Sequence, residues 1–244
     1  KTAATVAGAN DPTDIFPKST TTGGLFSNSG NLQVDAGHLN ISGGSSSGGN
    51  FATTAAGTTL SFSGRWTGLA GVSSAFAGST ILISTEDPNG STGGFFTAGA
   101  ATTILNVTGS GLRLGSAAYS AVKLDLNGNT LRNDGLLLLA TGNTTVSGAG
   151  AFENGSTGTF QTTGGTLTLN GGNFTNNGLM TVATGTVTLV GTATVTNSGT
   201  LTLSAAGVLA ANTSVTNNGQ MNISGTTTIS GTVAVTNSAT GTMT

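Results

Sequence analysis

The sequence predicts an all-β fold, a right-handed parallel β-helix (β-solenoid) with about 20–22 residues per coil. Three observations lead to this prediction. A motif of an apolar residue followed two places later by Asn recurs at that spacing. Short segments between the motifs alternate apolar and polar residues, and no proline follows Pro88. Because one repeat of this length cannot bury its apolar side chains alone, successive repeats must stack around a continuous core.

The Asn is the most regular feature of the motif. It recurs through the second half of the chain and also near the start, in "FSNSGNLQV". The members are Asn28, Asn133, Asn154, Asn176, Asn197, Asn217 and Asn237. Equivalent positions of successive coils lie above one another, and an Asn side chain carries both a donor and an acceptor. The sequence therefore predicts a structural Asn ladder at one corner of the solenoid.

The strands and corners follow from the residues between the motifs. A typical repeat, "VTNSGTLTLSAAGVLAAN", places apolar residues two apart, as in Leu201 and Leu203. This spacing puts both side chains on the inner face of one strand. Gly and Asn suit the corners, where a positive φ is needed. Absence of proline fits strands that are paired on both sides, and no helical spacing competes with this interpretation.

Composition divides the chain into three parts. Residues 1–22 hold two of the three prolines and predict an extended arm or a cap over the first coil. Residues 23–111 predict irregular N-terminal coils with loop insertions, and residues 112–244 predict regular coils. The motif starts once more at Val235. This last start predicts either a fragment of a longer repeat protein or an end that docks head-to-tail on another copy.

Charge excludes several classes of partner. Charged residues make up 6% of the chain, the net charge is -2, and no ionisable side chain follows Glu153. Without a basic patch we expect no nucleic-acid partner. Without a run of about 18 apolar residues we expect no membrane-spanning segment. Cysteine is absent, which excludes disulfides and thiolate metal sites.

We expect no catalytic residues, cofactor or metal site, although a carbohydrate-active β-helix enzyme is an alternative. Such enzymes cluster carboxylates with basic residues on one face. The candidates are Glu86, Asp87, Arg113, Lys123, Asp125, Arg132 and Asp134, and Asp125 and Asp134 would carry the reaction. We favour a solvated band of charge instead. The lone His38 has no acid or nucleophile near it in the sequence.

Two smaller expectations follow from the register. Arg132 and Glu153 occupy the same place in consecutive repeats, so they should be exposed cross-coil neighbours contributing at most ~1 kcal/mol. Thr-x-Thr pairs at Thr166 and Thr186 should stack, which makes ice binding a third alternative. The next coil is expected to break that column with Ala205 and Ala206, which favours Thr chosen for β-propensity.

The repeats "GGTLTLNGGNFTNNGLMTVATGTVTLVG" and "VTNSGTLTLSAAGVLAAN" resemble the β-solenoid passenger domains of bacterial autotransporters and of filamentous-haemagglutinin-like surface adhesins. The resemblance covers residues 112–244 and, in part, 23–64. It implies secretion, surface display, and adhesion or matrix building, and it supplies no catalytic motif. We therefore expect an extracellular or cell-surface structural protein, a filament subunit or an adhesin. Its expected partners are further copies of itself, stacked head-to-tail, or host or matrix glycans.

Overall fold

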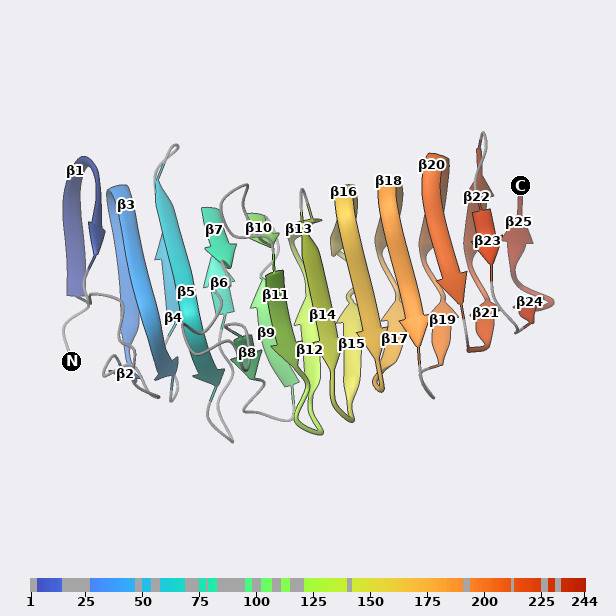
Figure 1. The fold of residues 1–244 in the computed structure, drawn as a ribbon, viewed down its shortest axis with the longest axis horizontal. Coiled ribbons are helices and arrows are strands. Elements are labelled where there is room, and N and C mark those ends of the chain that lie inside the picture. Colours follow the sequence, from blue (N-terminus) through green and yellow to red (C-terminus); the bar gives the residue numbers. More distant parts are fainter. Residues whose placement is uncertain are drawn as a thin grey trace.

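The computed structural model describes only part of the chain. The described residues are 4–14, 27–46, 50–53, 58–68, 75–77, 79–82, 95–97, 102–106, 111–114, 121–139, 142–190, 194–211, 213–224, 228–230 and 234–244. Every regular element among them is a β-strand. The strands stack side by side in parallel along the long axis of the molecule (Figure 1), which confirms the predicted β-solenoid.

The strand boundaries place the elements on this stack. In chain order the strands are β1 (Ala4–Asp14), β2 (Ser27–Asn28), β3 (Asn31–Ser46), β4 (Asn50–Thr53), β5 (Thr59–Gly68), β6 (Ala75–Ala77), β7 (Ser79–Leu82), β8 (Phe95–Thr97), β9 (Thr102–Asn106), β10 (Gly111–Leu114), β11 (Ala121–Asp125), β12 (Thr130–Asn133), β13 (Leu136–Leu139), β14 (Asn143–Ser147), β15 (Ala151–Asn154), β16 (Thr159–Asn170), β17 (Asn173–Asn176), β18 (Leu179–Val190), β19 (Val195–Asn197), β20 (Thr200–Ala211), β21 (Val215–Asn217), β22 (Gln220–Ile223), β23 (Thr228–Ser230), β24 (Val235–Asn237) and β25 (Thr242–Met243).

Two sheets build the walls of the solenoid. Among the described residues, sheet A has 18 strands, and sheet B has 7, in the order β24-β21-β19-β17-β15-β12-β9. Sheet A itself covers two sides, because β16 pairs with β13 through its first half and with β14 through its second half. The strand bends between these halves at Gly165, which has a φ of 76°. A positive φ of this size is readily adopted only by glycine, so each regular coil has three sides.

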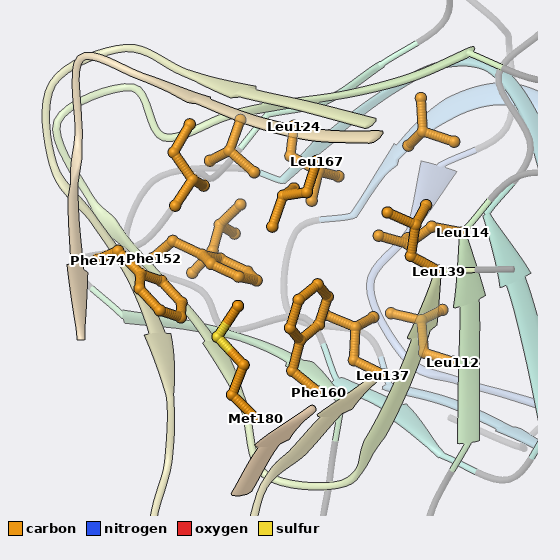
Figure 2. Packing of buried hydrophobic residues seen from close by; sticks show 14 of the residues in the cluster. Leu112, Leu114, Leu124, Leu137, Leu139, Phe152, Phe160, Leu167, Phe174 and Met180 are labelled. Atoms are coloured by element: carbon orange, nitrogen blue, oxygen red, sulfur yellow. The ribbon is translucent and has the colours of Figure 1, made fainter. Parts of the chain in front are cut away.

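The core lies between the three sides. Figure 2 shows Phe152 and Phe174 pointing inward from sheet B, Phe160 and Met180 from the first side of sheet A, and Leu167 from its second side. The ring centroids of Phe152 and Phe174 are 5.8 Å apart in a stacked arrangement. Phe152 also meets Phe160 edge-on at 6.5 Å. Aromatic pairs of this geometry add to the free energy gained from burial, so the three rings stabilise the stacking of these coils.

The same inward column becomes aliphatic toward the C-terminus. Phe174 pairs in register with Val195, and Val195 with Val215. Both valines are buried, at 4% and 0% exposed. A β-branched side chain suits a strand but fills less volume than a ring, so the last coils enclose a thinner core.

The described portion of residues 1–22 forms strand β1, which pairs in parallel with β3. The register runs from Ala4 opposite Leu32 to Asp14 opposite Asn40, with two irregularities between. Pro12 lies within β1 and cannot donate a backbone hydrogen bond. Among the described residues, β3 is the one strand that pairs with β1, and a proline is tolerated in a strand that is not paired on both sides.

Candidate functional site

The most distinctive polar group in the structure is the row of Asn residues that end the strands of sheet B. Their backbones are in register from each coil to the next. The row comprises Asn133, Asn154, Asn176, Asn197, Asn217 and Asn237. The first five are at most 1% exposed. Buried amides at this density need hydrogen-bond partners, and we call the row the Asn ladder.

Each ladder amide bonds to the next one. The Nδ2 atom of Asn133 donates to Oδ1 of Asn154 at 2.7 Å, and Asn154 donates to Asn176 at 2.8 Å. The three remaining steps, ending at Asn237, are each 2.7 Å. All five bonds run in the same direction, from the earlier coil to the later one. Aligned hydrogen bonds in a buried site polarise and strengthen one another.

The ladder amides also satisfy the backbone of the corner. Asn154 Nδ2 donates to the carbonyl oxygen of Leu179 at 3.0 Å, and Asn176 Nδ2 donates to that of Thr200 at 3.0 Å. Asn197 makes the equivalent bond to Gln220 at 2.9 Å. An unpaired buried carbonyl is costly. Each amide therefore joins two coils through both a side chain and a main-chain acceptor.

One end of the ladder reveals a residue that the sequence period missed. Within the part of the chain that the structure describes, the Oδ1 atom of Asn133 is buried without a hydrogen-bond partner. In the backbone register Asn133 lies opposite Asn106 of β9, and the register shifts by one residue just before this pair. Such a β-bulge places Asn106, rather than Leu105, opposite the ladder. Asn106 and Asn133 are further apart in the sequence than the 20–22 residues of the other repeats, so the repeat pattern did not identify Asn106 as a ladder residue.

The predicted first member of the ladder is placed differently. Asn28 belongs to β2, where it pairs in register with Ser46 of β3. It is buried, at 8% exposed. Its Oδ1 atom accepts a hydrogen bond from the backbone N of Gly30 at 3.2 Å. The prediction that Asn28 belongs to the Asn ladder is therefore wrong, because its neighbour in register is Ser46 of sheet A rather than another Asn. Its side chain contributes to a local turn instead.

The charged residues near β12 form a different pairing from the expected one. Arg132 and Glu153 are neighbours in register, as predicted. However, Arg132 makes its ion pair with Asp134, with Nε and Oδ1 2.8 Å apart. This hydrogen bond is the main reason why the pKa of Arg132 is raised, and the nearby Glu153 adds a weaker effect. Glu153 instead accepts a hydrogen bond from Asn177 Nδ2 at 3.0 Å.

The structure does not bring the two candidate catalytic carboxylates together. Asp125 ends β11, and its Oδ1 atom accepts from the backbone N of Asn127 at 3.0 Å. Asp134 follows β12 and is engaged by Arg132. The strand between them spans roughly 13 Å, whereas the carboxylates of glycoside hydrolases lie about 5–9.5 Å apart.

The other candidates are scattered or outside the described part. Arg113 lies on β10 and Lys123 on β11. Glu86 and Asp87 lie outside the described residues, as does the side chain of His38. Among the residues that the structure describes, no three His, Cys, Asp or Glu side chains come together in a group that could hold a metal ion. No helix in this part of the chain has the length and apolar character that a membrane span requires.

The threonine columns are also placed by the register. Thr166 stacks on Thr186 as expected, but the next coil breaks the column with Val208 rather than with Ala205 or Ala206. A longer column lies on the outer face of sheet B beside the Asn ladder. It consists of Thr175, Thr196, Thr216 and Thr236. The sequence interpretation missed this column because these residues stand inside the Asn motif rather than in Thr-x-Thr pairs.

The site is therefore a row of neutral amides whose hydrogen bonds are directed at neighbouring coils. It offers no nucleophile and no group that titrates near neutral pH. Comparison of the chain with protein-family models, with curated proteins and with solved structures found no match.

Proposed function

We propose that the chain is a structural extracellular or cell-surface protein, a stiff β-solenoid rod that serves as a filament subunit or an adhesin. The observation that carries this proposal is the Asn ladder. Its amides are buried, and they join each coil to the next from Asn133 to Asn237. Amide groups that are hydrogen-bonded between coils make the solenoid rigid, and they are not available to contact a substrate.

The surface supports the same proposal. No ionisable side chain follows Glu153, so long-range repulsion between neighbouring rods is weak over this part of the chain. The outer face of sheet B presents Thr175, Thr196, Thr216 and Thr236, for which the described residues provide no side-chain hydrogen-bond partner. Hydroxyl groups repeated at about 4.8 Å, the strand spacing, can bond to glycan hydroxyls or to a sister rod.

Electron microscopy of the purified protein, combined with binding to a glycan array, tests the proposal. Uniform filaments with the solenoid axis along the fibre would identify a filament subunit. Dispersed rods that bind specific glycans would identify an adhesin. Dispersed rods at high concentration that bind no glycan would contradict both forms, and release of reducing sugar ends from any arrayed glycan would point to the enzyme instead.

A further inference from the structure

Several corners of the solenoid contain an Asn followed by Gly. In such a pair the backbone N of Gly can attack the Asn side-chain carbonyl carbon, because glycine has no Cβ to hinder the approach, and Asn is a thermolabile residue for this reason. The pairs within the described residues are Asn127–Gly128, Asn154–Gly155, Asn170–Gly171, Asn177–Gly178 and Asn218–Gly219. Reaction requires a free Gly N–H and a side-chain amide that can move.

In three of these pairs the attacking nitrogen is occupied. Gly128 N donates to the carbonyl oxygen of Ala149 at 2.7 Å. Gly155 N donates to that of Asn133 at 2.8 Å, and Gly219 N to that of Asn197 at 3.0 Å. The nitrogen cannot attack while it is held in a cross-coil hydrogen bond. Asn154 is moreover a ladder residue, fully buried.

In a fourth pair the side-chain amide is occupied. Asn177 is half-buried, and its Nδ2 atom donates to Oε1 of Glu153 at 3.0 Å. This bond to a carboxylate is charge-assisted and therefore stronger than one between neutral groups. It holds the leaving nitrogen of Asn177 away from the geometry that the attack needs.

In the fifth pair, Asn170–Gly171, both the attacking nitrogen and the side-chain amide are available for reaction. Asn170 is the last residue of β16, and both it and Gly171 are exposed. Within the described part of the chain, neither the Asn170 amide nor the Gly171 N–H has a hydrogen-bond partner. Gly171 has a φ of 99°. Around it there is space, since an added Cβ would meet nothing closer than 3.5 Å.

We propose that Asn170–Gly171 is a site of spontaneous deamidation and that the fold protects the other four pairs. Gly171 N forms a bond to Cγ of Asn170, the bond from Cγ to Nδ2 breaks, and ammonia leaves with the proton from Gly171. Water then opens the succinimide ring at either carbonyl, which yields aspartate or isoaspartate. No redox partner is needed. The product places a carboxylate in a region that has no ionisable side chain after Glu153, and the inference does not depend on the proposed function.

Peptide mapping by mass spectrometry after prolonged incubation at mildly alkaline pH tests this proposal. Chymotrypsin suits the chain because Leu169 and Phe174 flank the site. One sample is kept native and a second is kept in urea, where all five pairs are unfolded. In the native sample we expect Asn170 to convert at least about tenfold faster than Asn154, which must wait for local unfolding. In urea the two rates should be similar.

The variant Asn170→Gln provides the control, because Gln forms the corresponding ring far more slowly. After ageing in the native state, the peptide of this variant that spans position 170 should contain no acidic product, while the unfolding of the variant in urea stays unchanged. An Asn170 that remains intact in the native protein overturns the proposal. Equal native rates at Asn170, Asn154 and Asn218 overturn it as well, because the fold would then protect none of them.

Discussion

Replacing Asn176 with Leu is expected to lower the free energy of unfolding by about 3–5 kcal/mol. The change keeps a similar side-chain shape but removes all polar atoms. Oδ1 of Asn197 then loses the donor that lies 2.7 Å away, and Nδ2 of Asn154 loses an acceptor at 2.8 Å. Asn197 Oδ1 stays buried without its donor, which costs about 1–3 kcal/mol. The lost bonds from Asn154 Nδ2 and to the carbonyl oxygen of Thr200 cost about 1 kcal/mol each, although Asn154 Nδ2 keeps the carbonyl oxygens of Gly158 and Leu179. Equilibrium unfolding in urea, analysed by the midpoint and slope, measures the loss.

The same substitution at the last member of the ladder is the matched control. Asn237 accepts from Asn217 Nδ2 at 2.7 Å, but it is exposed. Water can replace the lost bonds there, and Asn217 Nδ2 keeps the carbonyl oxygen of Thr242 at 3.0 Å. Asn237→Leu should therefore cost about 1 kcal/mol. Equal losses for the two variants would show that burial of the ladder does not matter.

Replacing Gly199 with Ala is expected to destabilise the protein by about 3 kcal/mol or more. Gly199 lies at the corner directly after the ladder residue Asn197. A Cβ built there would overlap the carbonyl oxygen of Gly178 and would lie 2.6 Å from the carbonyl carbon of Asn177. The obstacle is backbone of the neighbouring coil, which cannot rotate away like a side chain. The coils would have to separate, and Gly199 N would then lose its hydrogen bond to Asn176 O at 2.9 Å.

Gly30→Ala is the control for this second change. No atom lies within 4 Å of a Cβ built at Gly30, and its φ is not in the left-handed region. The expected effect is within about 0.5 kcal/mol. Thermal unfolding followed by circular dichroism compares the two variants directly. If Gly199→Ala left the stability as unchanged as Gly30→Ala does, the coils could not approach each other as closely at this corner as the structure shows.

The regular part of the fold could be predicted because its period is nearly constant. When the repeat length holds, position in the sequence fixes register, and register places Asn154 opposite Asn176 without any further information. The repeat length alone was enough to predict the strands, the inward-facing residues and the stacking of six Asn side chains in the Asn ladder.

The other features of the site could not be predicted from the repeat length, because they depend on local irregularities and on side-chain geometry. A bulge in β9 brought Asn106 opposite Asn133, although the spacing breaks the period. Asn28 carries the right motif, but its neighbour in the stack is Ser46, so the motif alone did not make a ladder residue. Arg132 had two carboxylates within reach of its strand, and only side-chain geometry selects Asp134 over Glu153.

Hydrogen exchange of the side-chain amides, measured by NMR, tests the central claim most directly. If the Asn ladder is a buried column that holds successive coils together, its Nδ2 protons exchange only when the coils open. We predict strong protection for Asn154, Asn176 and Asn197, and rapid exchange for the exposed Asn237. Rapid exchange of all four amides in the native protein would contradict a buried Asn ladder and, with it, the proposal that the ladder makes the solenoid rigid.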